Sequence, residues 1–393
     1  MQRRKLFCIL ALLLWTSLGL GASPSLAAEN TTEQQVQQQV ESVDLSKIQG
    51  FIDQLDQDTK DYFPQLNLSN LMSNLKAGKV DFSAQAFFSG IVKLLFKEVV
   101  ASSGILAKLV VLAVLCGVLQ HLQQSFEGSV GKVAQAMSYL VLITIAIASF
   151  TLAIDTGRKA IDDMVGFMQA LLPVQITLLV ALGNITSAAI FHPFVIGALS
   201  FISTLIKNFV FPLLFLGAVL AIVNNISEHM KVSKLAGLFN TASKAILGLC
   251  LTIFIGIMTI QGVTGSMSDG IALRSAKYAT DTFVPVVGRW FSDAIELVVG
   301  SALLLKNAVS LVGIIVICII CLIPIIKIVA MMLIYRVAAA LVQPLGNHGL
   351  SDALQSMGSS LTLVFASVAS VGIMFFMAIS IIMATGNMTV MLR

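Results

Sequence analysis

Apolar runs long enough to cross a lipid bilayer recur through the C-terminal two-thirds of this chain, and they constrain its fold more than any other feature. The clearest runs are residues 104–122, 134–154, 245–265 and 361–385. A transmembrane helix needs about 20 apolar residues to cross about 30 Å of hydrocarbon. Only 11% of the residues are charged, against about 25% in soluble domains. The sequence therefore predicts an all-α, polytopic helical membrane protein.

The N-terminus has the pattern of a secretory signal peptide. Three basic residues at positions 3–5 precede an apolar stretch at 6–20 and small residues at 25–28. This order of basic, apolar and small residues is typical of a segment that a signal peptidase removes. We expect residues 1–27 to be cleaved and the segment that follows to lie outside the cytoplasm. An uncleaved first helix is the alternative.

Residues 28–100 form a second region, which we expect to be extracytoplasmic, acidic and helical. Between residues 29 and 90 there are nine acidic residues and four lysines, a net charge of −5. Apolar residues at helical spacing predict an amphipathic helix that ends near Tyr62, and a later helix at 82–100 that lies on the membrane surface. So short a region buries only a marginal core. Its apolar faces therefore need the membrane domain or another protein as a partner, unless the region is a loose solvated cap.

The remaining residues, 101–393, are expected to form a membrane domain of about seven or eight transmembrane segments, with re-entrant helices as an alternative to further spans. An internal similarity runs through this domain. Residues 205–208 resemble residues 304–307, 99 residues later, and three matches that begin earlier in the chain have similar offsets and keep the same order. We interpret them as a duplicated unit of about 100–110 residues, near 113–225 and 226–350. Repeats of this kind build many transporter folds, with the working site at the repeat interface.

Charge bias helps to count the crossings. The loop 225–244 has three lysines and one glutamate, so it is expected to be cytoplasmic. If the first two spans return the chain to the outside at Asp155, an odd number of crossings must follow before this loop. A re-entrant hairpin over 171–206 followed by a span at 208–226 satisfies the count, and so do three short spans.

Two dipeptides, Gly183-Asn184 and His192-Pro193, are natural break points for either arrangement. The equivalent stretch of the second unit, 283–306, contains several charged residues. It is too polar to face lipid throughout, so we expect re-entrant or surface-lying structure there, buried against protein.

Lys207 and Lys306 are the strongest candidates for functional residues. Each follows a long apolar stretch and precedes an asparagine, Asn208 or Asn307, and another apolar run. An ionisable group in such a position is costly and must face protein, water or head groups. We therefore take these four residues as candidates for lining a transport path. The alternative is that the lysines reach the membrane interface along their own side chains.

Nothing in the sequence points to catalysis. There is no Walker-type phosphate loop, no cluster of histidines and carboxylates at metal-ligand spacing, and no nucleophile paired with a base. We expect no catalytic, cofactor-binding or metal site, no cofactor, and no nucleic-acid partner.

One block, residues 260–310, is more specific than its apolar composition. It contains Asp269-Gly270-Ile271-Ala272-Leu273-Arg274, Phe283-Val284-Pro285-Val286-Val287-Gly288 and Leu305-Lys306-Asn307-Ala308-Val309. With the signal peptide, the acidic segment and the length, this block resembles the stage III sporulation protein AE family of endospore-forming bacteria.

The resemblance implies a role and no chemistry. It implies a multi-pass protein of the mother-cell membrane around the forespore, in a channel or secretion-like complex that links the two cells. It also implies partners: membrane and ring-forming proteins of the same operon, an ATPase, and indirectly a forespore-membrane protein. The expected function is a subunit that forms or lines a transport path. The alternative is a non-conducting membrane scaffold that assembles the ring-forming and ATPase partners.

Overall fold

The computed structural model describes residues 48, 50, 51, 53, 84–125, 129–226, 232–283, 287–345 and 348–391. These residues are almost entirely helical, which confirms the predicted all-α class. The elements are α5 (Ala84–Ala101), α6 (Ser103–Ser125), α7 (Ser129–Ala181), α8 (Ile185–Leu205), the π-helix η1 (Ile206–Val210), α9 (Phe211–Ile226), α10 (Ser233–Phe283), α11 (Val287–Val342), the 3-10 helix η2 (Gln343–Leu345) and α12 (His348–Met391). The predicted signal peptide at 1–27, and most of the region to residue 83, lie outside the described residues.

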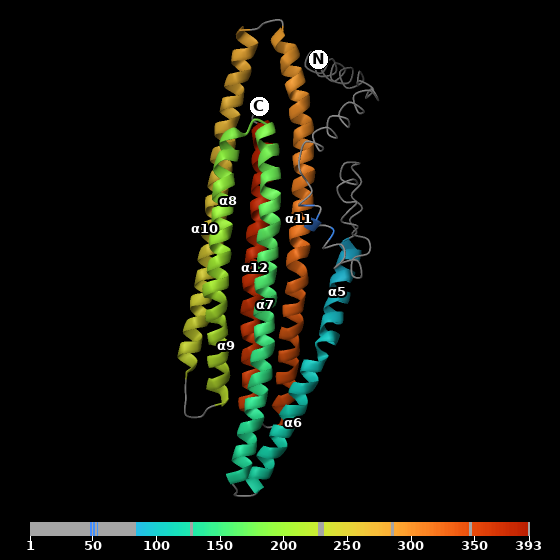
Figure 1. Ribbon diagram of the computed structural model, residues 1–393, viewed down its shortest axis with the longest axis vertical. Helices are drawn as coiled ribbons and strands as arrows, with labels where there is room; N and C mark the ends of the chain where they lie inside the picture. Colours follow the sequence, from blue (N-terminus) through green and yellow to red (C-terminus); the bar gives the residue numbers. More distant parts are fainter. Residues whose placement is uncertain are drawn as a thin grey trace, which may run out of the picture.

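The helices form one elongated bundle of antiparallel rods (Figure 1). Helix α12 packs against α7, α9, α10 and α11, so it is the central element. The α7–α8 turn and the C-terminus lie at one end of the bundle, and the connection between α6 and α7 lies at the other. We call these the upper and the lower end, as Figure 1 shows them. The tips of α10 and α11 extend beyond the upper end of the other helices.

Five described helical segments are long and apolar enough to span a membrane, which confirms the polytopic membrane class. The bent pair of α5 and α6, with 44° between its parts, makes a sixth if it is one broken span. We expected about seven or eight spans. The number is smaller because stretches that we separated are continuous: α7 runs from Ser129 to Ala181, and α8, η1 and α9 follow one another without a break from Ile185 to Ile226.

The loop and re-entrant assignments also change. Asp155 lies in the middle of α7 and not in an outer loop. His192 and Pro193 lie inside α8, so only the other predicted break point is a turn. Residues 287–306 belong to the long helix α11. Since α7 leads up and the α8–α9 rod leads down, the loop after α9 returns to the end of the bundle at which α7 starts.

The α7–α8 turn depends on a glycine. Gly183 has φ +85°, the left-handed region that favours glycine. Its N–H donates to Val180 O at 2.8 Å, and the N–H of Asn184 donates to Leu179 O at 3.1 Å. This pair of bonds is the Schellman motif that ends many helices. A Cβ at Gly183 would lie 2.8 Å from Leu273 Cδ2 on α10, so packing as well as backbone conformation requires glycine.

The π-helix η1 has a local cause in the sequence. Pro212 has no N–H to donate, and its ring would crowd the carbonyl four residues earlier in a regular α-helix. The helical turn instead contains one extra residue: the N–H of Phe211 donates to Ile206 O, five residues back. Such π-helical turns occur often at functional sites. This one contains the candidate Lys207.

Part of the N-terminal region packs on the bundle. The helix expected at 82–100 is present as α5, and its Leu94 is buried against Ile326 of α11. Ile48 is buried, and the ring of Phe51 meets that of Phe167 on α7 edge to face, with centroids 5.8 Å apart. At the described positions, the membrane domain itself is therefore the partner of these apolar side chains.

Candidate functional site

Lys306 is the most unusual polar residue of the bundle core. Its side chain is 0% exposed, and its Nζ donates a hydrogen bond to the carbonyl oxygen of Met383 on α12 at 2.8 Å. Gly386 makes this contact possible, because a Cβ there would lie 2.2 Å from the Nζ of Lys306. Leu182, beside the α7–α8 turn, lies 3.2 Å from the same point. Lys306 therefore points into the bundle near its upper end.

Asp269 on α10 is the buried acid at the same end. It is 2% exposed, and its two carboxylate oxygens accept the backbone N–H groups of Thr186 and Ser187 at 2.9 Å each. The first N–H groups of a helix have no partner within the helix and favour negative charge. The N-cap residue of α8, Asn184, makes no side-chain cap bond. Asp269 thus caps α8 from a neighbouring helix.

Further polar groups lie between these two charges. Ser266 Oγ on α10 approaches the carbonyl oxygen of Thr385 at 3.3 Å, next to Gly386 in sequence. Asn184 and Ser187 are buried, and their side-chain nitrogen and oxygen atoms have no hydrogen-bond partner among the described residues. Unsatisfied buried polar groups are costly. We call Asn184, Ser187, Ser266, Asp269, Lys306 and Thr385 the upper polar cluster.

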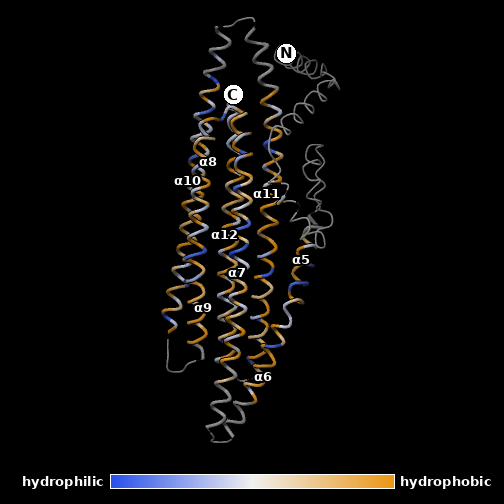
Figure 2. The backbone as a smooth tube through the Cα atoms, viewed as in Figure 1, coloured by the Kyte–Doolittle hydropathy of each residue, from blue (hydrophilic) through white to orange (hydrophobic). Residues whose placement is uncertain are grey.

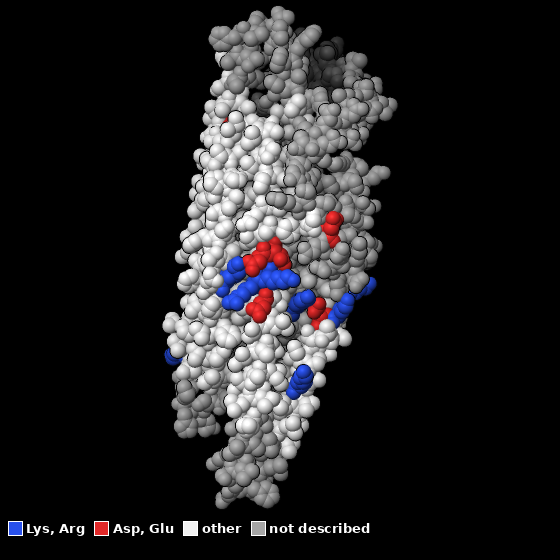
Figure 3. All heavy atoms as spheres, in the orientation of Figure 1, with Lys and Arg blue, Asp and Glu red and all other residues white. Residues whose placement is uncertain are grey.

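A second set of polar residues lies at mid-height on α5, α7, η1 and α11, and we call it the charged girdle. It consists of Lys93, Lys97, Glu98, Asp155, Arg158, Lys159, Asp162, Asp163, Lys207 and Lys327. These side chains are exposed or half-exposed. Figure 3 shows positive and negative side chains gathered at this level, with a few isolated charged side chains above and below them on the visible face. The packing of Leu94 against Ile326 brings the lysines of α5 to the level of Lys327.

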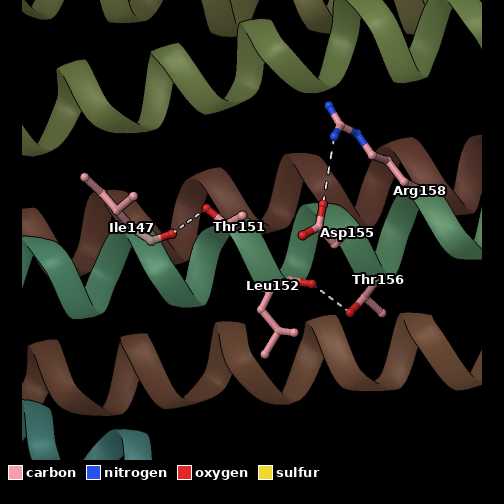
Figure 4. A network of polar contacts seen from close by, with 6 residues as sticks. All are labelled: Ile147, Thr151, Leu152, Asp155, Thr156 and Arg158. Carbon is pink, nitrogen blue, oxygen red and sulfur yellow. Dashed lines mark hydrogen bonds and ion pairs between the residues drawn. The ribbon is translucent and has the colours of Figure 1, made fainter.

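Ion pairs link several residues of the girdle. The ammonium group of Lys207, on η1, contacts a carboxylate oxygen of Asp162 on α7. Asp155 and Arg158, one turn apart on α7, form a looser pair with 3.9 Å between the nearest oxygen and nitrogen (Figure 4). The flanking Thr151 and Thr156 donate their hydroxyls to carbonyls of their own helix at 2.9 and 2.8 Å, as Figure 4 also shows. Threonines bonded in this way present little unsatisfied polarity to their surroundings.

The two lysine candidates therefore have different environments. Lys207 is half-exposed at mid-height and paired with an acid, whereas Lys306 is buried near the upper end and bonded to a carbonyl. The proposed repeat makes them equivalent positions, yet their surroundings differ. Asn208 is exposed, and the side-chain oxygen of Asn307 has no hydrogen-bond partner among the described residues.

Sequence reasoning misses three functional candidates. Asp162 belongs to an acidic pair that looks solvated in the sequence, and it pairs with Lys207 from 45 positions away. Asp269 stands out only as part of the block that carries the family resemblance. Gly386 gives no signal, since its role depends on a side chain of another helix. Asp269 is a charge within a largely apolar stretch, which is the available clue to it; the charged neighbours of Asp162 hide that residue.

Comparison with known proteins decides the family. The family model described as stage III sporulation protein AE matches residues 66–386. The chain belongs to the stage III sporulation protein AE family. It is 37% identical over 364 residues to the stage III sporulation protein AE of Bacillus subtilis (strain 168), covering 92% of this chain and 91% of that protein. No solved structure matches the chain.

Proposed function

We propose that this family member is a membrane subunit of a channel or secretion-like complex that links mother cell and forespore, located in the mother-cell membrane around the forespore. The observation that carries the proposal is the charged girdle. Ionised side chains on an apolar bundle must face water, lipid head groups or another protein, so they mark where this chain meets a partner or a wet path. The girdle lies at mid-height on a bundle that is apolar along most of its length (Figure 2).

The path, on this proposal, lies between subunits. The described interior of one chain is a continuous apolar core that joins α7, α8, α9, α10, α11 and α12. A polar solute needs a wetter route, and the outward charges of the girdle supply one where subunits meet. The other membrane and ring-forming proteins of the operon complete the assembly. An ATPase partner provides any energy input, since this chain carries no phosphate-binding loop and is proposed to have no enzymatic activity.

The second candidate is a non-conducting scaffold for the same partners. The packed apolar core favours it, because a sealed bundle holds partners without offering them a path. The two functions differ in what happens when a charged group is attached to the girdle. The attached group would obstruct a conduit, whereas a scaffold would continue to function.

The test uses single cysteines in a background whose own cysteines are replaced by alanine. Asp155→Cys and Lys159→Cys place the thiol in the girdle, and Leu140→Cys, on the same helix, is the matched control. In sporulating cells treated with an impermeant charged thiol reagent, we expect modification of the two girdle variants and a loss of late forespore gene expression. Modification without any loss would support the scaffold. Absence of modification would show that the girdle is sealed and would contradict a water-filled path.

A further inference from the structure

The rods are about twice as long as one bilayer is thick. The five candidate spans contain 39 to 45 residues. At 1.5 Å per residue these spans are about 58–68 Å long, against about 30 Å of hydrocarbon. Transmembrane helices tilt by at most about 40°, and a rod of about 60 Å tilted so far still rises about 46 Å. One bilayer therefore leaves a large part of the bundle uncovered.

The charged girdle divides the bundle into two layers whose exposed side chains are mostly apolar; Lys108 and Arg336 are exposed charges in the lower one. Above the girdle, α8 has 21 residues and is about 32 Å long. Below the girdle, η1 with 5 residues and α9 with 16 continue the same rod for a similar length. Each layer alone matches the thickness of a bilayer. Both layers expose large apolar side chains, such as Ile260 above and Leu238 below, at 66% and 61%.

Two observations assign the bilayer to the lower layer. Helix α6 lies at the lower end of the bundle (Figure 1) and exposes Val111 and Leu115, which need lipid around them. Ile48 and Phe51 belong to the acidic N-terminal region, and Phe51 contacts α7 at Phe167, one turn above the girdle residue Asp163. Asp53, two residues on, is exposed. A segment so rich in carboxylates is excluded from hydrocarbon.

We propose that the upper layer projects from the membrane on the side of the N-terminal region, and that its apolar surface is an interface between copies of this chain. In water, so large an apolar surface is a protein-interaction site or an aggregation hazard. Most of the large apolar side chains exposed in the upper layer lie on α8 and α10, two helices that contact each other. They include Ile185 and Phe201 on α8 and Ile260 and Ile271 on α10.

The shape of this face fits a second copy. Gly197 on α8 and Gly256 on α10 are exposed, and a Cβ added at either would meet no heavy atom within 4 Å. Phe201 and Ile260 follow these glycines by four residues, so each helix presents a bulky side chain beside a gap on the same face. Two such faces can interlock, which is how small residues let helices approach.

The experiment measures the membrane depth of each layer and the contact between copies of the chain separately. Single cysteines replace Ile260 in the upper layer and Leu238 in the lower layer of the same helix, α10, in the cysteine-free background. With a bimane label and vesicles of brominated phosphatidylcholine, we expect strong quenching at position 238 and little at 260. Equal quenching at both positions would place the upper layer in hydrocarbon and overturn the proposal.

Contact is measured with a short bis-maleimide on unlabelled protein in plain phosphatidylcholine vesicles. Phe201→Cys is expected to give a product of twice the chain mass, and Leu238→Cys is not. Adding Gly256→Leu fills the gap and should reduce the Phe201→Cys product at least about tenfold, while the melting temperature stays unchanged because the glycine faces open space. No dimer from Phe201→Cys, or a dimer that persists with Gly256→Leu, would overturn the self-interface. Neither measurement depends on sporulation, so a negative result for the self-interface does not contradict the proposed channel role.

Discussion

Gly386→Ala should destabilise the protein by displacing Lys306. The new Cβ would lie 2.2 Å from the Nζ and 2.9 Å from the Cε of Lys306, and 3.2 Å from Leu182 Cδ1. The lysine has to move, and its 2.8 Å bond to the Met383 carbonyl is lost. A hydrogen bond to a charged group contributes about 1.5–3 kcal/mol, while alanine in place of glycine returns at most about 1 kcal/mol of helix propensity. The expected net loss is about 1–2 kcal/mol.

The assay is thermal unfolding of the detergent-purified protein, read as the loss of the monodisperse peak after heating. Gly300→Ala is the matched control, since this glycine lies on α11, the helix of Lys306, and a Cβ there would meet no heavy atom within 4 Å. We expect Gly386→Ala to melt a few degrees lower and Gly300→Ala to melt at the same temperature or slightly higher, since alanine favours the helix. Adding Lys306→Met to Gly386→Ala removes the ammonium that needs an acceptor, so the two losses should not add. Equal melting of the two alanine variants, or full additivity, would refute this account of the contact.

Two further substitutions test the other charged contacts with the same melting assay. Asp269→Asn keeps the shape of the side chain but removes the negative charge at the start of α8, and should cost about 1 kcal/mol; an unchanged melting temperature would mean that the cap contributes nothing. Asp162→Lys and Lys207→Asp should each lower stability slightly, and the double exchange should restore about 0.5–1 kcal/mol, as expected for a partly exposed pair; a double variant no better than the singles would deny the pair any role.

The sequence was sufficient for the class of fold because the hydrophobic effect acts on composition and on the length of apolar runs. It also identified Lys207 and Lys306 as costly positions, since a charge in an apolar run is visible without a structure. The partners of those lysines were not predictable. Asp162 and Met383 come from other helices, and their approach depends on how the rods align along their length.

The predicted loops and helix breaks were wrong for a different reason. Asp155 and the charges after it look like the end of a span, because a chain that crosses one bilayer should not carry charges half-way along a helix. In the bundle these charges are part of α7. His192-Pro193 also stays helical, as proline is tolerated where neighbouring helices support the backbone. Single residues that often end a helix gave the wrong helix boundaries here, because tertiary packing sets the length of each helix.

The π-helical turn at η1 rotates α9 about the axis of the rod relative to α8. Each residue of an α-helix advances the side chains by about 100° around the axis, so one extra residue in a turn rotates everything after it. Helix α8 packs mainly on α7 and α10, whereas α9 packs mainly on α12 and α10. The rod therefore changes its neighbour at η1 without a loop. Deleting one residue from 206–210 would reset the phase, turn the apolar face of α9 away from α12, and leave every residue type in the bundle otherwise unchanged.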